Sequence, residues 1–193
     1  PGGRKQPDTV VEEDEFPRPD TQIEKLAALR TLNPSGVTTA ANASGLNDGA
    51  VAMVVASQSA GESVGETPLV RILSSGVAGV PPRIMGYGPV PAAEIALKRA
   101  GLTMADMDVI EINEAFAAQV LACLKGMGIA FDDSRVNPNG GAITVGHPLG
   151  ASGPRIALTA ARQLRRVEGR YALVSMCIGL GQGIAMVMER PDS

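Results

Sequence analysis

The sequence predicts a layered α/β domain with a mixed sheet, and three observations point to it. From about residue 68 onward, short apolar runs typical of strands alternate with segments of helical period. The last two strand-like runs are separated only by a glycine turn, so they should pair antiparallel. Hydrophobic residues make up 45% of the chain but aromatic residues only 3%, so aliphatic side chains must build the core.

The expected elements follow the chain in order. Residues 1–20 are polar and should be extended, and Thr21 with Glu24 has the spacing of a capping box that starts a short helix. Residues 37–39 are strand-like, and residues 58–67 form a polar loop at a domain boundary. Beyond this loop the predicted strands are 69–73, 109–112, 171–176 and 184–188, and the predicted helices are 91–100, 114–125 and 154–166.

Composition excludes several classes of function. The net charge of −3 provides no basic surface of the kind that nucleic-acid binding requires. No apolar run reaches the length of a membrane span, so no membrane partner is expected. Cys123 and Cys177 make no disulfide framework, which favours a reducing, cytoplasmic setting. Two cysteines and one histidine, widely spaced, match no standard metal site, so no metal is expected.

Asn113 directly follows the predicted buried strand 109–112. Ligands of open α/β sheets bind beyond the carboxyl ends of strands, where an asparagine can hold a water or polarise a carbonyl. The alternative is a helix N-cap, a position for which asparagine is among the best residues. Both roles remain open on spacing alone. Cys123 lies on the apolar face of the helix that follows, so it is expected in the core.

The only histidine, His147, lies in a run of glycines and small residues that spans 137–153. Glycine-rich backbone can approach a ligand closely, and an imidazole can titrate near neutral pH. Ser152 is a good N-cap and Pro154 suits a first helical turn, so the segment should bring His147 to the positive end of helix 154–166. That end would stabilise a thiolate or an oxyanion. The alternative is a structural histidine.

Cys177 ends a predicted strand and is followed at once by Gly179, Gly181 and Gly183. A thiol beside exposed backbone N–H groups is a reactive arrangement, because such donors lower the pKa of a thiol and can hold an oxyanion. The alternative is an inert cysteine before a tight hairpin.

Three segments in this order and spacing resemble the C-terminal half of a thiolase. They are Asn-Glu-Ala-Phe at 113–116, Gly-His-Pro-Leu-Gly-Ala-Ser-Gly at 146–153 and Cys-Ile-Gly-Leu-Gly-Gln-Gly at 177–183. Residues 42–50 and 85–89 match the same family, so the resemblance covers nearly the whole chain. It implies a thiolase-like layered fold with a mixed five-stranded sheet covered by helices.

The resemblance implies an acyltransferase that makes or cleaves 3-oxoacyl-CoA through an acyl-cysteine, with coenzyme A esters as substrates and no cofactor. His147 would be the base that activates the nucleophilic cysteine, and Cys177 would move the proton at the α-carbon. Asn113 would hold a water that stabilises the enolate oxygen together with His147. The Gly179 N–H would belong to a second oxyanion hole. The residues that match substrate- and CoA-binding positions of the family are Ser44, Met85, Phe116, Leu149 and Arg18.

The resemblance also divides the chain into parts. Residues 1–36 would be the tail of an inserted loop domain, 37–67 the last segment of the N-terminal core domain plus a linker, and 68–193 the C-terminal domain. The acylated cysteine of the family belongs to an N-terminal half that these residues do not include. The isolated chain is therefore expected to be inactive and to need that half as a partner. The full-length protein is expected to be a homodimer or homotetramer, with a role in fatty acid metabolism.

Two other classes compete with this interpretation. A β-ketoacyl synthase-like condensing enzyme would share the fold, but the Cys177 segment and the single histidine do not fit Cys-His-His or Cys-His-Asn sites. A non-catalytic thiolase-like carrier or remnant is the second alternative; the presence of Asn113, His147 and Cys177 argues against an evolved non-catalyst. Within the family, residues 83–89 and 137–139 are similar to aromatic-degradation thiolases that act on 3-oxoadipyl-CoA.

Overall fold

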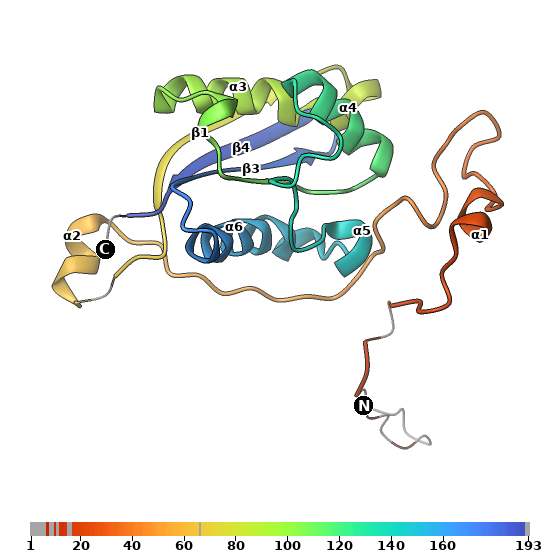
Figure 1. Cartoon of the computed structure of the whole chain (residues 1–193), viewed down its shortest axis with the longest axis horizontal. Helices are drawn as coiled ribbons and strands as arrows, with labels where there is room; N and C mark the ends of the chain where they lie inside the picture. The colour runs from red at the N-terminus through yellow and green to blue at the C-terminus, as the bar shows by residue number, and fades with distance from the viewer. Residues whose placement is uncertain (1–6, 8–9, 11, 15–16, 66, 192–193) are drawn as a thin grey trace.

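A mixed sheet forms the centre of the computed structural model, which describes residues 7, 10, 12–14, 17–65 and 67–191 (Figure 1). Its four strands in this described part are β1 (Arg71–Gly79), β2 (Val109–Ile112), β3 (Tyr171–Ile178) and β4 (Gln182–Glu189). They lie in the order β1-β4-β3-β2. The hairpin β3–β4 is antiparallel and β2 runs parallel to β3, so the predicted mixed sheet is confirmed.

Helices cover both faces of the sheet (Figure 1). The covering helices are α3 (Pro89–Ala100) and α4 (Ala117–Met127) on one face, and α5 (Ala142–Val145) and α6 (Leu149–Arg166) on the other. Side chains alternate along β3: Leu173 packs with buried residues of α3 and α4, whereas Ala172 and Val174 pack with those of α6. Cys123 is fully buried among the first group, as predicted.

The predicted fifth strand is wrong for the described residues, because the segment beside the free edge of β2 pairs only once. Val136 forms an isolated parallel bridge with Ile110. Asn137 then takes a left-handed φ of 43°, which turns the backbone out of strand geometry, and the next residue is a proline without an N–H. The Asn137 side chain continues the pairing in place of the backbone, since Oδ1 accepts from the Ile112 N–H and Nδ2 donates to the Ile112 carbonyl, both at 2.9 Å.

Two helices that border the motifs begin elsewhere than predicted. α4 begins at Ala117 rather than at 114, with Phe116 at its N-cap and no side-chain cap. α6 begins at Leu149, five positions before the predicted start at 154, so Ser152 and Pro154 lie inside it. The reason is the Pro148 carbonyl, which already accepts from the N–H groups of residues 151 and 152 at 2.8 and 2.9 Å.

Short helices occur outside the sheet domain and in its loops: α1 (Ile23–Ala27), α2 (Gln58–Ser63), η1 (Pro82–Tyr87) and η2 (Met104–Asp106). The capping box predicted at Thr21 is wrong, because Thr21 Oγ1 donates to the Arg18 carbonyl and the N-cap of α1 is Gln22. The loop predicted at 58–67 contains α2. Residues 1–6, 8, 9, 11, 15 and 16, which are part of the predicted tail 1–36, lie outside the described residues.

The strand predicted at 37–39 is also wrong. The side chain of Asn42 bonds to this stretch instead of a neighbouring strand: Oδ1 accepts from the Thr39 N–H at 2.7 Å, and Nδ2 donates to the Val37 carbonyl at 2.9 Å. A local turn therefore takes the backbone groups that strand pairing would need. The chain then runs extended past α6 toward α2 (Figure 1).

Candidate active site

His147 is held by side chains at both ring nitrogens. Its Nε2 lies 3.3 Å from Nδ2 of Asn113, and its Nδ1 lies 2.6 Å from Oγ of Ser152. Because the Ser152 hydroxyl donates to the Pro148 carbonyl at 3.1 Å, it accepts from His147, which places the ring proton on Nδ1. Nε2 then carries the lone pair, to which the Asn113 amide donates. This tautomer is the one that a base acting through Nε2 requires.

The interpretation of Asn113 as a helix cap is wrong. α4 begins three residues after the position that the cap required, and the Asn113 side chain points to the imidazole. Its backbone N–H continues the pairing of β2 with β3 by donating to the Ser175 carbonyl at 3.0 Å. Asn113 is 1% exposed, and its Oδ1 is buried without a hydrogen-bond partner among the described residues. A buried amide oxygen of this kind is available to a water or a substrate donor.

The backbone of His147 is fixed from a distant part of the chain. Its N–H donates to the Gly45 carbonyl at 3.1 Å and to Asn47 Oδ1 at 3.3 Å, and Leu46 forms a parallel bridge with it. The preceding Gly146 has φ 84° and ψ 168°, a region that only glycine enters readily. The segment 42–47 therefore determines where the imidazole lies.

The same segment holds the turn that follows Asn113. Ser44 donates its N–H to the Ala115 carbonyl at 3.0 Å, and Ala43 forms an antiparallel bridge with Phe116. Of the predicted substrate-binding residues, Ser44 and Phe116 are thus brought together next to the Asn113–His147 pair. This proximity could not be read from the sequence, where the two are far apart.

The other predicted substrate-binding residues have different positions. Leu149 is 68% exposed at the first turn of α6, directly beyond Pro148. Met85 lies in η1, which is tied to α4 by the bond from Cys123 Sγ to the Gly86 carbonyl at 3.2 Å. Arg18 is exposed in the N-terminal segment, which Figure 1 shows extending away from the sheet, so it is not brought to the site in this structure.

Cys177 lies at the same carboxyl edge of the sheet as Asn113. β3 is the neighbour of β2, and Cys177 stands two residues beyond Ser175, whose carbonyl Asn113 contacts. Strand alternation directs Cys177 to the face of Leu173 and the α3–α4 layer, and no hydrogen bond joins it to His147 among the described residues. Gly179 is exposed in the turn that follows, with open space where a side chain would be.

Burial sets the protonation of both reactive groups at neutral pH. Desolvation, aided by the positive charge of Arg155, lowers the pKa of His147 below its ordinary value, so the ring is neutral. Desolvation raises the pKa of the Cys177 thiol, so the sulfur carries its proton. His147 is therefore a proton acceptor and Cys177 a proton donor.

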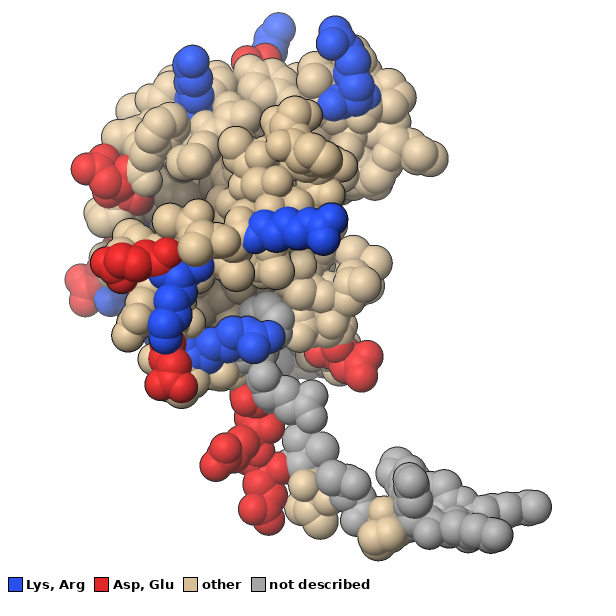
Figure 2. Space-filling model, turned by 90° about the vertical axis from the view of Figure 1, so that its right-hand side faces the viewer, with Lys and Arg blue, Asp and Glu red and all other residues tan. Residues whose placement is uncertain are grey.

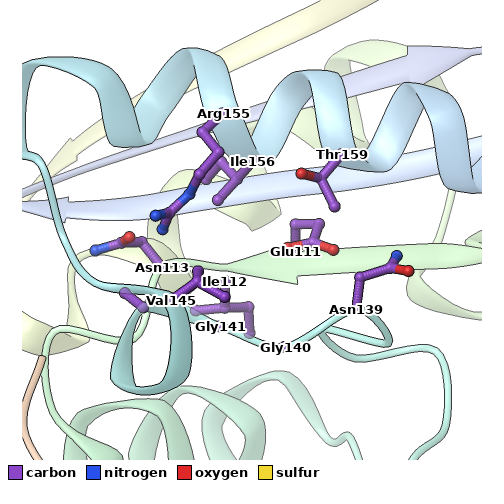
Figure 3. Close-up of a pocket in the computed structure, with 11 residues that line it drawn as sticks. Glu111, Ile112, Asn113, Asn139, Gly140, Gly141, Val145, Arg155, Ile156 and Thr159 are labelled. Atoms are coloured by element: carbon purple, nitrogen blue, oxygen red, sulfur yellow. The ribbon is translucent and has the colours of Figure 1, made fainter. Parts of the chain in front are cut away.

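A pocket of about 210 Å³ adjoins this site on the α6 face of the sheet (Figure 3). Its lining includes Asn113, Glu111 and Arg155, and Figure 3 shows the Arg155 side chain reaching from α6 toward Asn113. Glu111 is 2% exposed, and its Oε1 lacks a hydrogen-bond partner in the described part of the chain. Desolvation, with repulsion from Glu114, raises its pKa to about 8 although Arg155 opposes the shift, so this carboxyl is largely neutral at pH 7.

The residues that support the site were not predicted from the sequence. Glu114 accepts from Asn137 Nδ2 at 2.8 Å and from the Ile143 N–H at 3.2 Å, which ties the Asn113 turn to the histidine segment. Arg155 donates to the Gly146 carbonyl at 2.7 Å. A carboxylate inside the otherwise apolar run 109–112 was the one available signal for Glu111, whereas nothing local marked the partners of Glu114 or Arg155.

The remaining surface offers few other sites. On the face shown in Figure 2, Lys and Arg side chains are spread over the surface and several lie beside acidic side chains, and the exposed acids Glu12, Glu13 and Asp14 belong to the extended N-terminal segment. In the described part of the chain, no group of three or more His, Cys, Asp or Glu side chains could hold a metal ion. Within the same residues, no helix has both the length and the apolar character of a membrane span.

The structure is a layered α/β fold with this site at the carboxyl edge of its sheet, and comparison with known proteins identifies the family to which it belongs. The model of the thiolase C-terminal domain matches residues 66–190, and that of the thiolase N-terminal domain matches residues 2–59. The chain therefore belongs to the thiolase family.

Curated relatives and solved structures agree with this assignment. The chain is 57% identical over 189 residues to a beta-ketoadipyl-CoA thiolase of Pseudomonas aeruginosa, covering 97% of this chain and 47% of that protein. It is 55% identical over 183 residues to the 3-oxoadipyl-CoA/3-oxo-5,6-dehydrosuberyl-CoA thiolase of Escherichia coli, covering 94% and 46%. The crystal structure of human mitochondrial 3-ketoacyl-CoA thiolase superposes with a TM-score of 0.88 at 49% identity, covering 93% and 45%. The chain thus spans about half the length of the relatives it matches.

Proposed function

We propose that this chain supplies half of the active site of a thiolase that transfers an acyl group between a cysteine and coenzyme A. The observation that carries the proposal is the Asn113–His147–Ser152 arrangement, in which Nε2 of a neutral imidazole faces the carboxyl edge that also bears Cys177. Family membership supports it, and so do the relatives' names, which describe thiolases of 3-oxoacyl-CoA esters.

The proposed roles follow from proton positions. His147 accepts the proton of the nucleophilic cysteine, which lies outside these 193 residues, so that the thiolate can attack the 3-oxo carbon of the substrate. The carbon–carbon bond then breaks, and the Cys177 thiol gives its proton to the α-carbon of the departing acetyl-CoA enolate. A water held by Asn113 stabilises the enolate oxygen together with His147, and the Gly179 N–H stabilises the oxyanion at the acyl-thioester. The Cys177 thiolate then takes the proton of the CoA thiol, whose sulfur attacks the acyl-cysteine. The released cysteine thiolate regains its proton from His147, which restores all three groups.

We infer that 3-oxoadipyl-CoA is the first substrate to test. Two relatives that are at least 55% identical bear names for this ester, and Ser44, Phe116, Met85 and Leu149 would line the path of the pantetheine arm. Arg18 would contact the CoA phosphates once the N-terminal segment docks against the remainder of the enzyme. A crystal structure of the human relative in complex with CoA supports a CoA ester as the ligand.

The same proposal covers the division of the chain. Residues 1–36 would belong to a loop domain, 37–67 to the end of the N-terminal core domain, and 68–193 to the C-terminal domain. The two family models meet near residues 59–66, and Val54, 96% exposed, lies in a stretch that a completed N-terminal domain would cover. A cytoplasmic homodimer or homotetramer is the assembly we propose for the complete enzyme.

A chimera tests this function. The matching segment of the Pseudomonas aeruginosa relative is replaced by this chain, and CoA-dependent cleavage of acetoacetyl-CoA and 3-oxoadipyl-CoA is measured. We expect turnover that His147→Ala or Cys177→Ser lowers by about 10²- to 10⁴-fold. The 193-residue chain alone should show none. A chimera that assembles like its parent but has no activity, or keeps it in both variants, would contradict the proposal.

A further inference from the structure

Arg155 bonds to the residue that precedes the histidine. It lies in the second turn of α6, and its guanidinium donates to the Gly146 carbonyl at 2.7 Å. Gly146 has φ 84° and ψ 168°, and the orientation of the peptide that joins it to His147 sets the position of the His147 backbone. An arginine that holds this carbonyl therefore constrains the histidine without touching the ring.

Arg155 is the charged group that acts on the imidazole, and Glu111 and Glu114 act in turn on Arg155. The charged residues on the elements around His147 are Glu111 in β2, Glu114 in the turn after it, Asp48 beyond the segment 42–47 and Arg155 in α6; α5 contributes none. Glu111 is buried with its pKa raised to about 8, so it contributes little negative charge at pH 7. No carboxylate lies within salt-bridge distance of Arg155 among the described residues, so its positive charge is not neutralised by direct contact.

We propose that Arg155 is a positioning residue for His147, which fixes the peptide before the histidine and holds a positive charge beside the ring so that it stays a neutral proton acceptor. The direction follows from electrostatics, because a nearby cation disfavours the imidazolium. Burial lowers the pKa of His147 most, and the Arg155 charge acts in the same direction. The catalytic consequence rests on the proposed thiolase function, whereas the effect on the ring does not.

The single histidine makes a direct test possible. Because His147 is the only histidine of the 193 residues, the ¹³C-labelled imidazole gives one signal whose titration midpoint belongs to it alone. Arg155→Gln and Arg155→Met both remove the charge, and the apolar stem of methionine keeps more of the packing. Arg155→Lys keeps the charge, and Arg162→Gln removes an exposed charge from the same helix as a matched control.

We expect the midpoint to move to higher pH in Arg155→Gln and Arg155→Met, to return most of the way in Arg155→Lys, and to stay unchanged in Arg162→Gln. In the chimera, the acidic limb of the kcat/KM profile should move in the same direction. A midpoint that does not move in a charge-removing variant with a native amide spectrum would overturn the proposal, as would an equal shift in Arg162→Gln. A shifted midpoint in a chimera without turnover would instead count against the thiolase function alone.

Discussion

The hydroxyl of Ser152 lies 2.6 Å from Nδ1 of His147 and donates its own proton to the Pro148 carbonyl at 3.1 Å. These two bonds orient the imidazole from one side, while Asn113 contacts it from the other. Ser152 is fully buried inside α6, so its hydroxyl is committed to this pair of contacts rather than to solvent or to capping the helix.

Ser152→Ala should therefore impair the histidine without unfolding the domain. Loss of the outer partner of a metal-bound histidine costs about 10- to 100-fold in activity, and we expect a decrease of similar size in kcat/KM of the chimera because Ser152 holds the ring in the same way. Ser59→Ala, which changes an exposed serine of α2, is the matched control and should leave kcat/KM unchanged. Equal rates for the two variants would show that Ser152 does not orient the ring.

Glu111 should make stability fall as the pH rises. Its pKa is about 8 in the folded chain against 4.5 for an ordinary glutamate, so the folded state holds a proton that the unfolded state has lost. Stability is thus fully present below about pH 4.5 and decreases toward about pH 8, by at most about 1.4 kcal/mol per pH unit. Urea unfolding of the 193-residue chain across this range measures the slope.

Glu111→Gln should remove that contribution to the slope, because a neutral amide has no proton to lose. Glu94→Gln, an exposed position on α3, should leave the slope as it is. A slope that is the same in Glu111→Gln and in the unsubstituted chain would mean that the carboxyl is ionised in the folded state.

Gly146→Ala should destabilise the histidine segment. The backbone there has φ 84° and ψ 168°, and a Cβ would collide with the side chain of Asn47. Conformational strain of this kind costs about 1–3 kcal/mol. Gly150→Ala provides the contrast, since open space surrounds that helical position and alanine should stabilise α6 by up to about 1 kcal/mol. Denaturant midpoints measure both effects: the midpoint should fall in Gly146→Ala and rise in Gly150→Ala.

Asn137→Ala should loosen the edge of β2. The asparagine amide satisfies both backbone groups of Ile112 and one oxygen of Glu114, so alanine leaves several buried polar groups unpaired. Each such group costs about 1–3 kcal/mol. Asn139→Ala, two residues on and exposed, should change the free energy of unfolding by less than about 1 kcal/mol. If the two variants were equally stable, the Asn137 side chain would not be replacing backbone pairing at Ile112.

Local sequence pattern was sufficient to predict much of the fold. The alternation of apolar runs predicted the layered architecture, and the glycine turn after Cys177 predicted the antiparallel β3–β4 hairpin. The order of the motifs also singled out Asn113 and His147, which the structure joins by a hydrogen bond. Element boundaries were less predictable, because Ser152 and Pro154 favour a helix start as a local sequence but lie within α6 once Pro148 accepts the first bonds.

The assignment of residues to strands and helices follows from local sequence, because strand and helix periods and turn chemistry act between near neighbours. Contacts between groups far apart in the chain depend on the fold. Asn137 bonds to Ile112 across 25 residues, and Asn47 bonds to His147 across 100. The tertiary structure also set the pKa of Glu111, since removal of water by the surrounding fold is the main cause that raises the pKa of this carboxyl from 4.5 to about 8.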